Sequence, residues 1–531
     1  MQAKPQPHRY VPVALFLIIA ANLAEIWSFH YFPSADGPSH LEMAATISQL
    51  WRGLCPNLNS LYHFTHAVTP NWVTYFLLIP LMHFFTGAVA EKIVVSLYVI
   101  FLPLAVYKFI KTTNPTSAPL AIPACLLLSN YLLYSGSYSF LLSLVFYIYS
   151  LHWFIHNREN LSTKNCFILL FLFTANYLFH LCGFVFFAIS IFVILTSEIK
   201  ATGFRTYVKR GLFSFLAACP SLAALAQYMS LPKPPISGDA SFIERVIYTL
   251  FPTTFITSNA DIYLMYFITI SLALLLFYIC TLKQRTNSKF LGWLALTFTL
   301  LLLFGPFYFA GGWLVETRLQ LYILLIFIFW LAAFNHSKLF LRIIVCASLP
   351  ALLVQIWLTI PIFTKYNRIA AEYVVENSRI PNNSTIFAAD ISPFTIDYAS
   401  NETNTRYSYS HLAGYLVANK TCVAEISNYH LGEQNSFPIT YRDATNPNMH
   451  LGQFRTNYGL QIIPPQINLD TYPIKPDYIL IKGSRENLFK YPAAYGLDEQ
   501  GLYNNFMQQI TRNYRLEYES PDLIYKIYRP K

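Results

Sequence analysis

The sequence predicts a polytopic all-α membrane bundle of about 11 transmembrane helices, followed by a C-terminal soluble α/β domain. Of its 531 residues, 55% are hydrophobic and only 12% are charged, whereas soluble domains carry roughly 25% charged residues. The apolar runs are too many and too long for a soluble core. After about residue 364 the chain becomes polar and rich in Asn, Tyr and Pro. We therefore expect a membrane domain over residues 1–364 and an extracytoplasmic domain over 365–531.

Eleven apolar segments are the expected transmembrane helices. They are 11–29, 91–110, 118–134, 137–155, 165–180, 181–197, 211–229, 262–281, 289–309, 319–334 and 339–361. The first reads as an uncleaved anchor, since no cleavage site precedes His30. The pair 165–197 is short for two crossings, and Lys164 and Lys200 at its ends favour a tight hairpin with its tip near His180.

Residues 70–87 are apolar but contain Pro80 and His83 and lack cationic anchors. We expect them to lie along the outer interface, or to be re-entrant, within a long first outer loop over residues 30–90. If this segment does not span, the Lys and Arg residues before residue 365 divide into fifteen on the inner side and five on the outer side. The inner ones are Lys4, Arg9, Lys108, Lys111, Arg158, Lys164, Lys200, Arg205, Lys209, Arg210, Lys283, Arg285, Lys289, Lys338 and Arg342; the outer ones are Arg52, Lys92, Lys233, Arg245 and Arg318.

This asymmetry follows the positive-inside rule. It predicts a cytoplasmic N-terminus and an outer C-terminal domain, which fits a bacterial inner membrane with that domain in the periplasm. The net charge of +10 therefore reflects topology signals in short loops, and we expect no nucleic-acid partner.

The cysteines give no metal pattern. Six of the eight lie in apolar segments and are most simply small buried hydrophobes. Cys55 and Cys422 fall in outer segments and could pair in an oxidising compartment. The sequence shows no CxxC or Cys/His zinc spacing, and it leaves that pairing open.

The C-terminal residues show alternating short strands and helices. We expect a helix over 365–378, strands over 384–389, 421–426, 478–482 and 523–528, and helices over 410–417 and 500–512. This pattern predicts a small α/β domain.

The first outer loop carries the strongest candidate for chemistry. Gly37-Pro38 turns the chain sharply, and Ser39 can cap a helix with Glu42 three residues beyond it, the capping-box pattern. We expect that helix from about His40 to Arg52, with Asp36 just before its N-terminus. An acid in this place is most often only a cap, but Asp36 is also the first acid facing outward after the first span, which favours catalysis.

Other polar residues share the outer side. His63 and His66 lie in the same loop as Asp36, and the guanidinium forks of Arg318 and Arg245 suit phosphate, although an Arg at a span end is often a snorkelling side chain.

Histidines allow two further interpretations. His180, in an apolar hairpin, is either a satisfied core residue or a functional polar group at a span end. A metal site built from His40, His63, His66 and Asp36 would lack tight ligand spacing, and no metal site is predicted.

The first span and the loop Ser34-Ala-Asp36-Gly-Pro-Ser-His40-Leu resemble the GT-C superfamily of polytopic glycosyltransferases. The sequence is also similar to a group of bacterial multi-pass proteins with Asp-Gly-Pro-x-His at this point. Their later features are similar too, over most of the chain: Pro70-Asn71-Trp72, Ala90-Glu91-Lys92, Gly136-Ser-Tyr-Ser-Phe140, Gly311 and Gly312 before Arg318, His411, Gly414-Tyr415, Asn428-Tyr429 and Phe437-Pro438.

This resemblance implies a membrane glycosyltransferase. It would move a sugar from a polyprenyl-phosphate donor to a glycan, lipid or protein acceptor, with Asp36 as general base. The other catalytic candidates are His40 and Glu42, and the candidates for binding the lipid phosphate are Arg318, Arg245, His63, His66 and His180. The paired acids of many GT-C members are absent, so dependence on a divalent metal stays open.

Two other functions stay open. One is a transporter or flippase for a lipid-linked saccharide, which should carry ionisable groups at mid-membrane and repeated halves. The spans here are nearly free of charge and show no repeat. The other is a non-catalytic envelope-assembly subunit whose outer domain binds a partner.

Overall fold

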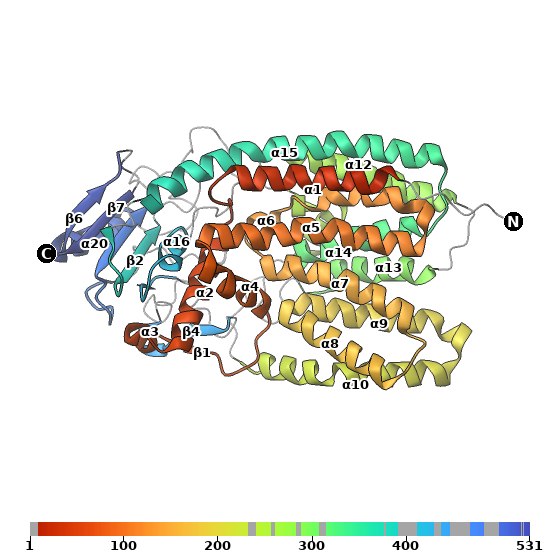
Figure 1. Ribbon diagram of the computed structural model, residues 1–531, viewed down its shortest axis with the longest axis horizontal. Helices are drawn as coiled ribbons and strands as arrows, with labels where there is room; N and C mark the ends of the chain where they lie inside the picture. The colour runs from red at the N-terminus through yellow and green to blue at the C-terminus, as the bar shows by residue number, and fades with distance from the viewer. Residues whose placement is uncertain are drawn as a thin grey trace.

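A bundle of long helices carries a small mixed sheet at one end in the computed structural model (Figure 1). We call this end of the bundle the sheet end. The structure describes residues 9–231, 240–255, 261–282, 288–306, 315–375, 379–390, 411–428, 437–446, 468–482, 499–521, 523 and 525–531. Of the sequence features named above, Lys4, Lys233, Lys283, Arg285, Gly311, Gly312 and Tyr429 lie outside these residues.

Eight helices of the described part are long and apolar enough to cross a membrane, as expected of a multi-pass membrane protein. They are α1 (Tyr10–Ser28), α5 (Gly87–Thr113), α7 (Tyr138–Asn157), α9 (Leu181–Thr202), α10 (Phe204–Met229), α12 (Asp261–Thr281), α14 (Val315–Ala332) and α15 (Lys338–Val375). Shorter helices join them: α3 (Pro56–Leu61), α8 (Thr163–Phe179), α11 (Phe242–Leu250) and α13 (Lys289–Phe304). The α8–α9 junction lies at His180, where the hairpin tip was predicted.

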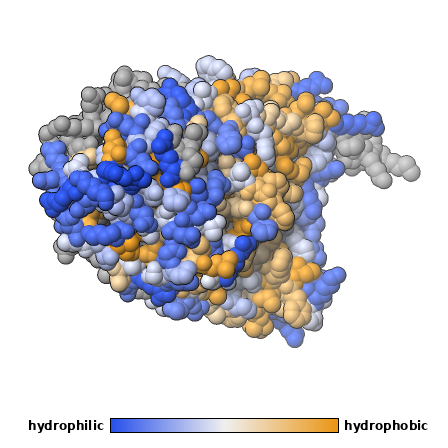
Figure 2. All heavy atoms as spheres, turned by 60° about the vertical axis from the view of Figure 1, so that its left-hand side comes forward, coloured by the Kyte–Doolittle hydropathy of each residue, from blue (hydrophilic) through white to orange (hydrophobic). Residues whose placement is uncertain are grey.

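The bundle has an apolar belt on its surface. Figure 2 shows apolar side chains over the helices, between the polar sheet end and polar residues at the opposite end. Large side chains on this belt are mostly exposed, including Phe16 at 68%, Phe171 at 62% and Phe277 at 70%. Such a continuous apolar exterior is typical of a surface covered by lipid.

The predicted span over 118–134 is not an α-helix. Two 3₁₀ helices, η1 (Pro115–Ala121) and η2 (Pro123–Leu127), replace it, and a single turn, α6 (Tyr131–Tyr134), follows. Pro119 and Pro123 lack the N–H groups that an α-helix would need. A 3₁₀ helix rises about 2.0 Å per residue, so Pro115–Leu127 still extends about 26 Å. Gln355 of α15 holds this segment by donating to the carbonyls of Leu126 and Ser129.

Residues 70–87 form α4 (Trp72–Phe84), which packs against α2 (Gly37–Arg52) at the sheet end (Figure 1). Its 13 residues span about 20 Å, too short for a hydrocarbon core of about 30 Å. This length agrees with the prediction that the segment does not cross.

The C-terminal residues form a mixed five-stranded sheet, in the order β3-β2-β5-β7-β6. The strands are β2 (Thr385–Asp390), β3 (Ala424–Glu425), β5 (Tyr478–Lys482), β6 (Tyr514–Glu519) and β7 (Tyr525–Pro530), with helices α16 (Ala413–Ala418) and α20 (Glu499–Asn513). β2 runs parallel to β3 and β5, whereas β7 is antiparallel to β5 and β6. The unpredicted β6 is an edge strand whose polar, charged sequence gives little strand signal. The helix predicted over 339–361 and the one predicted over 365–378, as far as the structure describes it, are one continuous helix, α15, which ends at Val375. Residues 376–378 lie outside the described residues.

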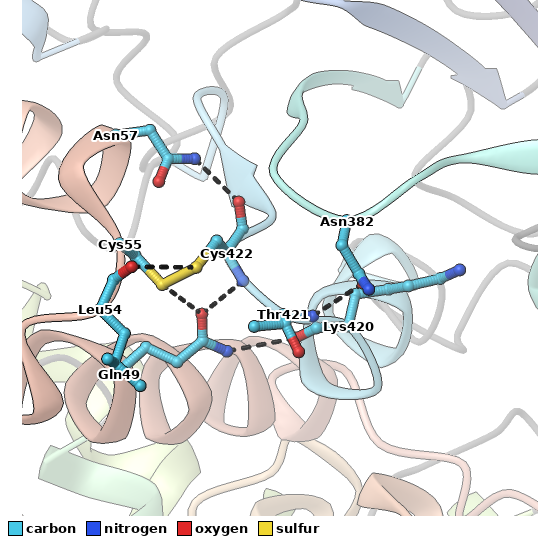
Figure 3. The surroundings of a disulfide bond; sticks show 8 residues. All are labelled: Gln49, Leu54, Cys55, Asn57, Asn382, Lys420, Thr421 and Cys422. Atoms are coloured by element: carbon cyan, nitrogen blue, oxygen red, sulfur yellow. Dashed lines mark hydrogen bonds between the residues drawn. A yellow bond between two sulfur atoms is a disulfide. The ribbon is translucent and has the colours of Figure 1, made fainter.

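The first loop and the C-terminal residues are joined by a disulfide bond (Figure 3) and by strand pairing. Cys55 and Cys422, whose pairing the sequence left open, form a disulfide with Cα atoms 5.4 Å apart. Beside it, Gln49 of α2 donates to the carbonyl of Lys420 and accepts from the backbone N–H of Cys422. β1 (Tyr62–Phe64) pairs antiparallel with β4 (Ile439–Tyr441). These links hold the C-terminal residues on α2.

Candidate functional site

Asp36 occupies the N-cap position of α2, which begins at Gly37 rather than at about His40. Pro38 fits this start because the first turn of a helix does not need its N–H. The predicted capping box is wrong: Ser39 lies inside the first turn, and the Glu42 carboxylate instead accepts from Asn428 at 2.5 Å. Asp36 makes no side-chain cap hydrogen bond to α2, so its carboxylate does not serve as a helix cap.

A turn almost one hundred residues away holds the Asp36 backbone. The N–H groups of Ala35 and Asp36 donate to the carbonyls of Tyr134 and Ser135, at 2.8 and 3.1 Å. Gly136 in the same turn has a φ of 86°, which only glycine adopts readily. A Cβ on Gly136 would also lie 2.7 Å from the Gly37 nitrogen. Gly136 therefore permits the close approach that positions Asp36.

A buried carboxylate, Glu91, fixes the other side of the loop. It accepts hydrogen bonds of 2.6 Å from the hydroxyls of Ser34, Tyr138 and Tyr415. These donors come from the first loop, α7 and α16. A Cβ at Gly37 would lie only 1.8 Å from Glu91 Oε1. Position 37 must therefore be glycine, because Glu91 leaves no room for a Cβ atom there.

The C-terminal residues close over the start of α2. Gly414 of α16 packs so tightly that a Cβ there would lie 2.0 Å from the carbonyl oxygen of Pro38. The segments that the resemblance singled out one by one, at Asp36, Glu91, Gly136 and Gly414, thus meet at one corner of the sheet end.

His40 and Glu42 lie on opposite sides of α2, because residues separated by two positions along a helix point about 200° apart around its axis. His40 Nδ1 lies 3.0 Å from the Tyr75 hydroxyl of α4. Burial lowers the pKa of His40 to about 4, against a weaker raising effect of its bond to the Gly136 backbone, so it is neutral at pH 7. Glu42 faces Glu425 of β3, and burial, together with that second carboxylate, raises the pKa of Glu42.

Asp36 is the titratable group best suited to base chemistry here. Burial raises the pKa of its carboxyl from 3.8 to about 7, and the positive charge of Arg318 partly opposes this shift. The side chain still keeps part of its surface accessible. Arg318 of α14 lies over the ring of Phe140, with its guanidinium carbon 5.7 Å from the ring centroid. A carboxyl that can take up a proton near pH 7 thus lies within the field of one cation.

Arg318 also lines a largely apolar cavity of about 230 Å³ between α9, α13 and α14. His180 and Asn71 line the same cavity, and most of the remaining wall is aliphatic or aromatic. His180 Nδ1 accepts from the backbone N–H of Cys182 at 3.0 Å. Burial and the nearby charge of Arg318 lower the pKa of His180 well below its usual value. This cavity can accept an apolar chain with a polar, anionic end.

Arg245 is placed differently from Arg318. It is 7% exposed, and its guanidinium donates to the backbone carbonyls of Ala240 and Gly305. These bonds join α11 to the end of α13. Arg245 is thus bonded to Gly305, a residue of the cavity wall, but does not itself line the cavity.

His63 and His66 lie together, with ring centroids 6.0 Å apart. Burial, followed by the charges of Arg442 and His66, lowers the pKa of His63, which Asp443 partly opposes. They belong to the β1–β4 side of the structure. Among the described residues, no three His, Cys, Asp or Glu side chains gather as metal ligands would.

Two residues of the site, Glu91 and Asn71, were named only within motifs of the resemblance and not as functional candidates. A carboxylate inside an apolar run was the available signal for Glu91, whereas nothing local distinguishes Asn71 from an ordinary helix cap. Comparison with known proteins adds no assignment: no family model matches the sequence, and no curated protein matches it significantly.

Proposed function

We propose that the protein is a glycosyltransferase that moves a sugar from a polyprenyl-phosphate donor to an acceptor hydroxyl at the outer face of a membrane. The observation that carries the proposal is that Asp36, whose pKa lies near 7, is within the electrostatic influence of Arg318, and that Arg318 lines an apolar cavity. General bases work best when their pKa lies near the operating pH. The sheet end would then face the periplasm of a bacterial inner membrane.

In the proposed reaction, the acceptor oxygen forms a bond to the anomeric carbon of the donor sugar. The bond from that carbon to the phosphate oxygen breaks, and its electron pair stays on the leaving phosphate. Asp36 takes the proton of the acceptor hydroxyl. Arg318 stabilises the negative charge that develops on the phosphate, because a charge-assisted hydrogen bond is strongest in a site of low dielectric.

The surrounding residues have positioning roles in this scheme. His40 is neutral at pH 7 and bridges α2 to α4 and to the Gly136 turn. Glu91 fixes the loop on the other side of Asp36. Glu42 faces away, toward Glu425, and in the proposed mechanism it stabilises the contact between α2 and the C-terminal residues.

The test is sugar transfer in membrane vesicles that hold the full chain, with polyprenyl-phosphate sugars as donors and mass spectrometry of the glycosylated products. Asp36→Asn should lower the transfer rate about 10²- to 10⁴-fold, the usual contribution of a general base. Arg318→Gln should lower it comparably, and Arg318→Lys less, since Lys keeps the charge but loses the planar fork.

Matched controls are Glu159→Gln and Arg52→Gln, because both native side chains are exposed. They should leave transfer unchanged. Full transfer by Asp36→Asn at a normal protein level would refute the proposal. A variant that stops moving lipid-linked saccharide across the membrane, with transfer intact, would instead indicate a transporter.

A further inference from the structure

The residue Asn71 has a side-chain amide without any hydrogen bond to the described residues. It stands at the N-cap of α4 with a φ of 72°, yet it makes no side-chain cap bond to that helix. Its Oδ1 atom is buried and has no hydrogen-bond partner in the part of the chain that the structure describes. A buried polar atom without a hydrogen-bond partner destabilises the folded state. Neither helix capping nor packing among the described residues explains why an amide stands here.

Hydrogen bonds fix the position of the Asn71 backbone, so the side chain starts from a defined point. Its carbonyl accepts a 3.2 Å bond from Ser139 Oγ, and Ser139 in turn lies 2.7 Å from the Thr74 hydroxyl. These bonds join the start of α4 to α7. Asn71 therefore lines the cavity from a rigid backbone position, as a residue that selects a ligand must do.

The polar groups of the cavity differ in chemistry. Arg318 offers only donors and a positive charge. Because His180 Nδ1 accepts from the backbone, neutral His180 carries its proton on Nε2 and is also a donor. The other two lining residues with an oxygen or nitrogen atom in the side chain are Tyr228 and Asn71. Asn71 differs from Arg318 and His180 in chemistry. It is uncharged, and rotation of its amide presents either an acceptor or a donor.

We infer that Asn71 selects the sugar of the donor by hydrogen-bonding one of its hydroxyl groups, while Arg318 and His180 take the phosphate. A hydroxyl group both donates and accepts, so it matches the amide in either orientation, whereas phosphate oxygens only accept. The inference rests on the proposed function and adds to it a residue that determines specificity.

The experiment measures binding of two probes to the full-length protein in lipid nanodiscs: polyprenyl phosphate and polyprenyl-phosphate glucose. Asn71→Gly removes the amide and keeps the backbone, since glycine adopts a positive φ without cost. It should weaken binding of the glucosylated probe about fivefold to tenfold, the usual effect of one hydrogen bond, and leave binding of the bare phosphate unchanged. Mannose and xylose derivatives repeat the test if glucose is not accepted.

Asn383→Gly is the matched control, because Asn383 also has a positive φ, of 63°, but is exposed near β2. It should change neither affinity. Equal weakening of both probes by Asn71→Gly, or no weakening of either, would overturn the role of Asn71. Failure of the wild-type protein to bind any of the probes would instead overturn the proposed function, so the two failures are distinguishable.

Discussion

Ionisation of Asp36 should destabilise the folded protein, and Asp36→Asn should therefore stabilise it in a way that depends on pH. Burial raises the pKa of Asp36 from 3.8 to about 7, so the folded state holds this proton more tightly than the unfolded state does. The contribution of Asp36 to the free energy of unfolding is therefore greatest below about pH 4. It falls as the pH rises to about 7 and is constant above that.

The pKa gap sets the magnitude of this effect. A gap of about 3 pH units, at about 1.4 kcal/mol per unit, corresponds to at most about 4 kcal/mol. This gap already includes the opposing effect of the Arg318 charge, because the pKa of about 7 is the net result of burial and that charge. An unfolding entropy of about 2.1 cal/mol/K per residue over 531 residues converts each kcal/mol into about 1 °C.

The assay is thermal unfolding in nanodiscs at several pH values between 5 and 8, followed by intrinsic fluorescence. Asp36→Asn should unfold up to about 4 °C above wild type at pH 8, and the gap should shrink toward pH 5. Glu159→Gln, at an exposed position, should show no such trend. A gap that is constant with pH, or an Asn variant that is less stable at pH 8, would refute the placement of Asp36 in a desolvated corner.

Three further perturbations test the same corner. Gly37→Ala should destabilise the protein by about 1–3 kcal/mol, since its Cβ meets Glu91 at 1.8 Å. Gly211→Ala in α10, with open space around it and no positive φ, is the control, and equal destabilisation of the two variants would contradict this packing. Glu42→Gln should raise the unfolding temperature by a few degrees at pH 8 and less at pH 5, because the raised pKa of Glu42 makes its ionised form unfavourable; melting curves with no such trend would argue against the contact with Glu425. Cys55→Ser should lower the free energy of unfolding by about 2–4 kcal/mol and make the melting temperature insensitive to reductant, whereas a wild-type protein unaffected by reductant would speak against the disulfide with Cys422.

Much of the helical framework could be predicted from sequence because apolar length is a local property. The runs that became α1, α5 and α7 needed no knowledge of their neighbours. Likewise, the hairpin tip at His180 followed from two flanking lysines. The 3₁₀ segment at Pro115–Leu127 was mistaken for an α-helix, because hydropathy reports that a segment is apolar and not how prolines change its hydrogen bonding.

The sequence by itself also determined that Asp36 follows the first span, beside a turn. Only the tertiary structure decided its chemistry, because a pKa depends on desolvation and charge from residues far along the chain. Asp36 lies against the Gly136 turn and within the field of Arg318, and Glu42, only six residues further on, faces Glu425 instead. Hydrophobic patterning therefore set which segments are helical, whereas long-range packing set which carboxyl can act as a base.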